Sequence, residues 1–456
     1  MNAILIKKIH TLVTMDGDAP PLSDVDLFIR NNKIAAIGKN LKSELADTHI
    51  IDGSHCAVYP GFINTHHHFS QTLTRNVPAV QNAKLFDWLT WLYEVWKGLT
   101  PDAIEVATKV ALGELLLSGC TTASDHFYLF PRTASSEFLD CEIDVAREIG
   151  IRFHPCRGSM SNGRSQGGLP PDSVVQTHDE ILADCARVID KYHDPDPYSM
   201  CRIALAPCSP FSVTTELLRD TAELARANGV RLHTHLCETK DEEAYCLEKY
   251  KCRPLDYMDE AGWLAADVWY AHGIYFNDDE IARIAAAGAG IAHCPASNLR
   301  LGSGICPVPK LLDAGVTVGL AVDGSASNDS SSMLREMQLA LLIHRVGTAV
   351  DAMPPRMVLE MATRAGSRIL GQPEIGRLVV GSAADIAMFR LDRIEFAGAM
   401  SDPASAILFC GSGVRAEYTI VNGRVLVEKG ELTEMDEDEI FNKANKMTSE
   451  LLKGAI

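Results

Sequence analysis

The sequence lacks the features that mark a secreted or membrane-bound protein. No stretch approaches 18 unbroken apolar residues, so we expect no membrane-spanning helix. The first residues show no apolar segment followed by a small-residue cleavage site, so we expect no signal peptide. The 13 cysteines are scattered and include no Cys-x-x-Cys pair, which favours reduced thiols over a disulfide framework. Together these absences predict a cytoplasmic protein.

Positive charge is scarce relative to negative charge. The chain has 42 Lys and Arg residues against 60 Asp and Glu residues, which gives a net charge of −18. Such an acidic surface argues against nucleic acid or an anionic membrane as a partner. It suits an enzyme that acts on a small molecule, for which assembly into a homo-oligomer would be ordinary. With 456 residues, of which 46% are hydrophobic, the chain can build more than one domain, or one barrel with an appendage.

The two ends of the chain are rich in strand patterns. Residues 3–14 and 26–37 alternate β-branched and polar residues, with Asn31-Asn32 as a turn signal. Near the other end, 384–389, 418–421 and 424–427 are strand-like, and Asn422-Gly423 is a strong hairpin signal. We therefore expect residues 1–59 and 371–440 to form a composite β-sandwich domain. Residues 60–370 would form the catalytic domain, and 441–456 a helical tail.

The middle of the chain alternates short apolar runs with helical patterns. The clearest helix should follow Thr100, an N-cap residue, with Pro101 at its first position. Alternation of strands and helices predicts a parallel sheet, and eight repeats fit a (β/α)8 barrel. The eight predicted strands are 57–63, 120–124, 151–156, 202–206, 230–232, 268–270, 290–292 and 316–322.

Histidine and aspartate recur at the C-terminal ends of the predicted strands, where the active-site residues of a barrel lie. His66 and His68 share one face of an extended segment, and His67 points the other way. Three imidazoles and one carboxylate suit zinc or ferrous iron, and such an ion lowers the pKa of a water towards ~7. Spacing leaves two choices open: His67 alone could replace the pair, and His233 could replace His235. The candidates are His66, His68, His235, His272 and Asp323.

Glu238 follows His235 by three residues. If the chain turns there, its carboxyl group can lie near the metal's water and act as an acid or base. The alternative is an ordinary solvated carboxylate, because four charged residues follow at 240–243. By residue type alone the two interpretations are equally good.

Several segments resemble the amidohydrolase superfamily, in its branch of guanine, cytosine and triazine deaminases. They are PGFINTHHH from Pro60, LHTHLCET from Leu232, YAHG from Tyr270, HCPASN from His293 and GLAVDGSASNDSS from Gly319. ATRAGSRILG from Ala362 and IGRLVVGSAADIAMF from Ile375 extend the resemblance over nearly the whole chain.

The resemblance implies a role for each residue at the strand ends. His66, His68, His235 and Asp323 would bind one divalent metal ion, zinc or iron. Asp323 would also be a base, Glu238 a proton shuttle, and His272 a group that orients and polarises the site. No lysine ends the fourth strand, where the two-metal branch has one, so one ion is expected. The implied reaction is hydrolytic deamination of an aminated purine-like heterocycle, with 8-oxoguanine first, and guanine, isoxanthopterin or an amino-s-triazine as alternatives.

Substrate contacts are less defined by the sequence. The amide of Gln71, the guanidinium of Arg157 and the ring of Trp88 could hold a planar heterocycle. The stretch 157–171, rich in Gly, Ser and Pro, should form a long loop at the barrel mouth. Two other functions stay open. One is cyclic-amide hydrolysis, which usually requires the missing lysine, and the other is a non-catalytic scaffold, which would be expected to have lost ligands.

Overall fold

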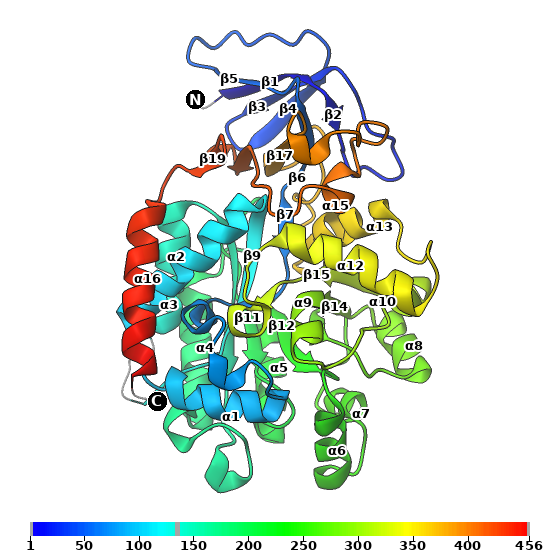
Figure 1. Ribbon diagram of the computed structural model, residues 1–456. Helices are drawn as coiled ribbons and strands as arrows, with labels where there is room; N and C mark the ends of the chain where they lie inside the picture. Colours follow the sequence, from blue (N-terminus) through cyan, green and yellow to red (C-terminus); the bar gives the residue numbers. More distant parts are fainter. Residues whose placement is uncertain (1–2, 133–136, 454–456) are drawn as a thin grey trace.

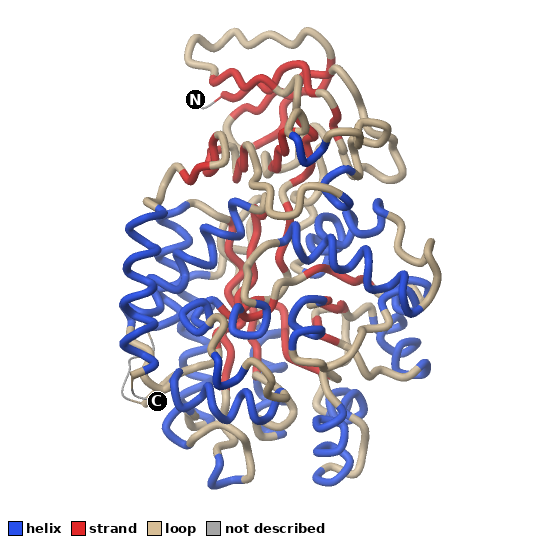
Figure 2. The backbone as a smooth tube through the Cα atoms, viewed as in Figure 1, coloured by secondary structure: helices blue, strands red, loops and turns tan. Residues whose placement is uncertain are grey.

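The computed structural model describes residues 3–132 and 137–453, and its centre is a barrel of parallel strands (Figure 2). Eight strands pair in succession, one for each predicted run. They are β7 (Phe62–Asn64), β9 (Cys120–Phe127), β10 (Arg152–Ser159), β11 (Ala204–Pro207), β12 (Arg231–Leu236), β13 (Val268–His272), β14 (Gly290–His293) and β15 (Thr317–Leu320).

The barrel closes where the first and last strands meet. The Thr65 N–H donates to the Leu320 carbonyl at 3.2 Å, and the Asp323 N–H donates to the His66 carbonyl at 3.1 Å. Two very short strands, β8 (His67–His68) and β16 (Asp323–Gly324), then pair in parallel. This closure places the early histidines beside Asp323, although more than 250 residues separate them in the chain.

Helices surround the barrel (Figure 2). In α2 (Pro101–Leu117) the Thr100 hydroxyl accepts the Ala103 N–H, as the N-cap pattern predicts. The longer of the others are α1 (Leu85–Trp96), α3 (Phe138–Ile149), α4 (His178–Tyr192), α5 (Thr215–Ala227), α6 (Lys240–Lys249), α8 (Asp278–Ala287), α12 (Met333–Gly347) and α16 (Glu437–Leu452). The shorter are α7 (Pro254–Glu260), α9 (Pro295–Arg300), α10 (Val308–Asp313), α11 (Ser325–Asn328), α13 (Pro355–Glu360), α14 (Gly366–Ile369) and α15 (Ala406–Phe409).

Short segments of other helix types join these elements. Met361–Ala365 is a π-helical turn between α13 and α14. The 3₁₀ turns are Phe69–Thr74, Pro78–Val80, Arg164–Gln166, Asp172–Val174 and Ile394–Phe396.

Two further sheets lie together at one end of the barrel (Figure 1). One has the order β4-β3-β1-β5 and the other β2-β6-β17-β18-β19-β20. Apolar side chains of both sheets share one core, which includes Ile6, Leu27, Val58 and Ile386. The strands are β1 (Ala3–Ile9), β2 (Thr11–Leu12), β3 (Val25–Arg30), β4 (Lys33–Gly38), β5 (His49–Asp52), β6 (Cys56–Pro60), β17 (Ile386–Arg390), β18 (Tyr418–Val421), β19 (Arg424–Glu428) and β20 (Glu431–Leu432). The predicted sandwich built from both ends of the chain is thus confirmed.

The first predicted barrel strand, 57–63, is two strands. Its first part is β6, which pairs antiparallel with β17 in the outer sheet, and only its end enters the barrel as β7. Gly61 separates them, where a Cβ atom would collide with the Thr121 side chain. The exact domain boundaries stay a prediction. Helix α16 begins at Glu437, four residues before the predicted tail, and residues 454–456 of that tail lie outside the described part of the chain.

Within residues 3–132 and 137–453, no helix is both long and apolar enough to cross a membrane.

Candidate metal centre and active site

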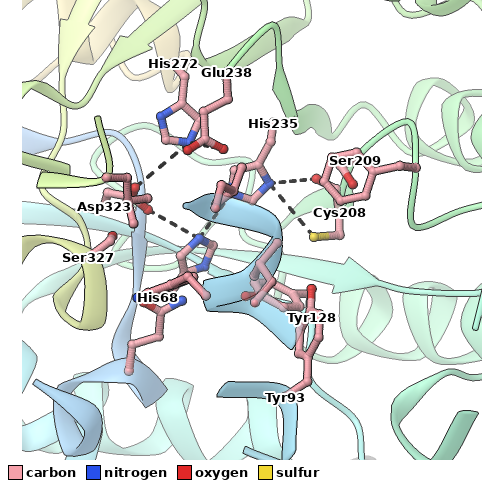
Figure 3. Close-up of a pocket in the computed structure, with 16 residues that line it drawn as sticks. His68, Tyr93, Tyr128, Cys208, Ser209, His235, Glu238, His272, Asp323 and Ser327 are labelled. Carbon is pink, nitrogen blue, oxygen red and sulfur yellow. Dashed lines mark hydrogen bonds and ion pairs between the residues drawn. The ribbon is translucent and has the colours of Figure 1, made fainter. Parts of the chain in front are cut away.

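Three imidazoles and one carboxylate converge at the mouth of the barrel, and Figure 3 shows His68, His235 and Asp323 among them. Nε2 of His68 lies 3.1 Å from Nε2 of His235. Oδ1 of Asp323 lies 3.2 Å from Nε2 of His66 and 3.4 Å from Nε2 of His68. The ligand atoms of His66, His68, His235 and Asp323 all lie within 4.8 Å of one another. The structure therefore brings together four of the five strand-end candidates predicted from the sequence.

The hydrogen bond made by Nδ1 of each ring determines whether Nε2 carries a proton or a free lone pair. Nδ1 of His68 donates to the His126 carbonyl at 2.7 Å, and Nδ1 of His235 donates to the Cys208 carbonyl at 2.6 Å. A carbonyl oxygen can only accept, so both protons are on Nδ1 and both Nε2 atoms have free lone pairs. Two such atoms facing each other at 3.1 Å cannot form a hydrogen bond, but they can bind a cation placed between them.

His66 is held in the same tautomer by a second histidine. His233 donates from Nδ1 to the Trp269 carbonyl at 2.9 Å, so its Nε2 accepts the proton on Nδ1 of His66 at 2.7 Å. Nε2 of His66 is buried and has no hydrogen-bond partner among the described residues. Burial lowers the pKa of His66 and His233 well below the usual value, so both rings are neutral. The geometry thus favours His235 over His233 as the residue that faces the cation site.

His67 points away from this cluster, as the alternation of an extended segment predicts. Its Nδ1 accepts the His68 N–H at 2.7 Å, and its Nε2 donates to the Ser331 hydroxyl at 2.9 Å. Both ring nitrogens are therefore used in structural hydrogen bonds.

Asp323 is an anion in this environment. Burial alone would raise its pKa, but the close contact with His66 and the nearby His272, whose own pKa is raised, hold the pKa of Asp323 well below its usual value. Its backbone has φ 61° and that of His272 has φ 75°, both in the left-handed region that residues other than glycine rarely adopt. Strain of this kind clusters at functional sites. A negative oxygen among three lone-pair nitrogens fits a divalent cation such as zinc.

Glu238 and His272 lie beside this cluster rather than in solvent. Oε2 of Glu238 lies 3.5 Å from Nε2 of His272, which is 3.9 Å from Oδ2 of Asp323. Burial raises the pKa of Glu238, and His272 partly offsets this. Burial alone would lower the pKa of His272, but the carboxylates of Glu238 and Asp323 raise it overall. On its other side His272 donates from Nδ1 to Oδ1 of Asn298 at 2.9 Å.

A cavity opens onto these groups. Gln71 and Trp88, two of the predicted substrate contacts, line it. Arg157 is not among the lining residues: its Nε pairs with Asp184 at 2.8 Å, and its other nitrogens bond to Gly158 and Gln176. The reason is that β10 continues to Ser159, so Arg157 lies within the strand and packs toward α4.

Other lining residues were not predicted from the sequence. They are Leu85, Leu89, Tyr93, Tyr128, Cys208, Ser209, Phe211, Leu301 and Ser327. Tyr128 directly follows β9, so it could have been predicted as a site residue from its position at the end of a barrel strand. Tyr93 and the leucines of α1 carry no sequence signal that separates them from ordinary core residues.

Comparison with known proteins gives a consistent result. The model of the family described as the amidohydrolase family matches residues 57–426. An 8-oxoguanine deaminase of Pseudomonas aeruginosa is 49% identical over 403 residues, which cover 88% of this chain and 89% of that protein. A hydroxydechloroatrazine ethylaminohydrolase of a Pseudomonas species is 36% identical, with coverage of 100% and 97%.

A solved structure extends the comparison to three dimensions. The crystal structure of an atrazine chlorohydrolase from Arthrobacter aurescens complexed with zinc has a TM-score of 0.93 and 36% identity. The match covers 98% of this chain and 100% of that one. The chain therefore belongs to the amidohydrolase family, and it is a metal-dependent hydrolase of carbon–nitrogen bonds other than peptide bonds.

Proposed function

We propose that this protein deaminates 8-oxoguanine by hydrolysis, giving urate and ammonia. One observation carries the chemical part of the proposal: three of the four residues that could hold a cation, a buried carboxyl group and a further imidazole line the same cavity. The choice of substrate is supported by the 8-oxoguanine deaminase that is 49% identical over most of this chain.

In this proposal four residues hold the metal ion. His66, His68 and His235 would each contribute Nε2, because each has its proton on Nδ1. Asp323 would contribute one carboxylate oxygen. When bound, a divalent ion supplies a Lewis acid that makes water a nucleophile at neutral pH.

The remaining groups move protons. Oδ2 of Asp323, 3.9 Å from Nε2 of His272, would accept the proton that the attacking water gives up. Glu238, whose pKa is raised by burial, would donate a proton to the ring nitrogen beside the carbon that bears the amino group. Nε2 of His272 would hold the attacking oxygen. Return of a proton to the amino group would then release ammonia.

The cavity walls suit a flat heterocycle. Leu89, Phe211 and Leu301 provide apolar surface. Oε1 of Gln71 and Nε1 of Trp88 are buried without hydrogen-bond partners among the described residues. One is an acceptor and the other a donor, so together they can pair with the N–H and C=O groups at the edge of an oxidised purine. This contact set supports a substrate with both kinds of group.

The test is a panel of substrates with the zinc-loaded enzyme. Ammonia release would be measured with 8-oxoguanine, guanine, isoxanthopterin and an amino-s-triazine, and compared as kcat/KM. We expect 8-oxoguanine to give the highest value. A higher value for another heterocycle would replace the proposed substrate, and no ammonia from any of the four would defeat the proposed reaction.

A further inference from the structure

Glu242 is a buried carboxylate outside the metal cluster and outside the cavity lining. It lies in the first turn of α6, and only 1% of its surface is exposed. Its two neighbours in that turn differ: Asp241 is exposed, and Glu243 forms an ion pair with Arg253 at 2.6 Å. Glu242 alone of these three turns back toward the end of β12.

Both carboxylate oxygens of Glu242 accept backbone N–H groups. Oε1 accepts from Cys237 at 2.9 Å, and Oε2 accepts from Glu238 at 3.3 Å. An ordinary capping box would bond the N-cap residue, here Thr239, whose hydroxyl already accepts the Glu242 N–H at 3.4 Å. Glu242 instead bonds the two residues that precede the cap, and one of them is Glu238.

The same peptide segment is also held from its other side. The Cys237 carbonyl accepts the N–H groups of Ile274 and Tyr275, at 2.9 and 3.0 Å, from the loop after β13. Cys237 has φ 55°, in the left-handed region, a conformation that surrounding bonds must enforce. The direction in which Glu238 leaves the backbone is therefore fixed by Glu242 on one side and by the His272 loop on the other.

Burial of Glu242 has an electrostatic consequence. Burial raises its pKa to about 7, although the two N–H groups oppose this. A carboxylate is an expensive group to bury when a simple helix cap could stay in solvent. The buried position of Glu242 is explained if its carboxylate holds the backbone that orients Glu238.

We propose that Glu242 is a positioning residue that aims the Glu238 carboxyl group at the substrate and at His272. The inference rests on the proposed role of Glu238 as the proton donor. Glu242 touches neither the metal ligands nor the cavity, and it acts only through the backbone of residues 237–238.

The test uses Glu242→Gln in the zinc-loaded full-length enzyme, with Asp241→Asn as the matched control. Glutamine keeps the shape of the side chain, but its NH2 group cannot accept, so one backbone N–H loses its partner. We expect kcat to fall about 10–100-fold, because a small misplacement of a reacting group has an effect of this size. KM and zinc content should stay within about twofold of the wild-type values, and Asp241→Asn should match the wild type.

A double-mutant cycle with Glu238→Gln separates positioning from a general structural effect. If Glu242 acts through Glu238, Glu242→Gln should cause no further loss of kcat once Glu238 is glutamine. An equal loss in both backgrounds, or wild-type kcat in Glu242→Gln, would overturn the inference. If Glu238→Gln itself kept full activity, the proposed role of Glu238 would fail instead, so the two failures are distinguishable.

Discussion

Replacement of His233 by alanine tests whether His233 holds His66 in the tautomer that can bind a metal ion. His233 does not face the cation site, yet its Nε2 accepts the proton on Nδ1 of His66 at 2.7 Å in a fully buried environment. Without that acceptor, the free protein can move the His66 proton to Nε2. Binding of a cation would then require the proton to return to Nδ1, where no partner is left.

The expected loss follows from the cost of that unpaired group. A buried donor without a partner costs about 1–3 kcal/mol, which corresponds to roughly 10–100-fold weaker metal binding. Competition with a chromophoric zinc chelator would measure the dissociation constant. His235→Ala, which removes a proposed ligand, should weaken binding more than His233→Ala.

The matched control is His154→Ala. His154 is also a buried barrel histidine, but neither of its ring nitrogens has a hydrogen-bond partner among the described residues. The zinc dissociation constant of His154→Ala should stay within about threefold of the wild-type value, whereas that of His233→Ala should rise about 10–100-fold. Wild-type zinc affinity in His233→Ala, or equal losses in His233→Ala and His154→Ala, would refute the tautomer argument.

Three further predictions concern catalysis, pH dependence and stability. Glu238→Gln should keep the zinc and lose about 10²–10⁴-fold in kcat; loss of zinc, measured by elemental analysis, would mean that Glu238 is a ligand. Burial raises the pKa of Glu336 from 4.5 to about 8. Between these values the folded state binds a proton that the unfolded chain has lost, so the free energy of unfolding should fall with rising pH, by roughly 5 kcal/mol at most from this group. In urea titrations, the free energy of unfolding of Glu336→Gln should depend less on pH than that of the wild type. An equal pH dependence in the two proteins would contradict the raised pKa of Glu336. Asp385→Asn should lower the free energy of unfolding by about 3–5 kcal/mol, because it leaves the buried Arg152, now 3.0 Å from Asp385, without its counter-charge. A change below about 1 kcal/mol, the value for an exposed pair, would contradict that reasoning.

Much of the barrel could be predicted because apolar runs and helical patterns alternate along the sequence. The sequence predicts one strand over 57–63 because both halves of this run are apolar. The break at Gly61 depends on a contact with Thr121, which belongs to a distant segment. Strands β8 and β16 have two residues each, too few for any periodic pattern.

The grouping of His66, His68, His235 and Asp323 could be predicted because the ends of parallel strands meet at one edge. Spacing could not decide between His233 and His235, since both lie on the same face of β12. The decision depends on the carbonyl groups of Trp269, in β13, and of Cys208, directly after β11. Arg157 was expected to contact substrate, but the sequence carries no signal that β10 continues two residues beyond it.

The most direct test of the whole account is a crystal structure with anomalous diffraction at the zinc edge. The account predicts one peak in the barrel, about 2.0–2.2 Å from Nε2 of His66, His68 and His235 and from one carboxylate oxygen of Asp323. A peak bound through Nδ1 atoms, a peak that Asp323 does not reach, or none in this cluster would contradict it.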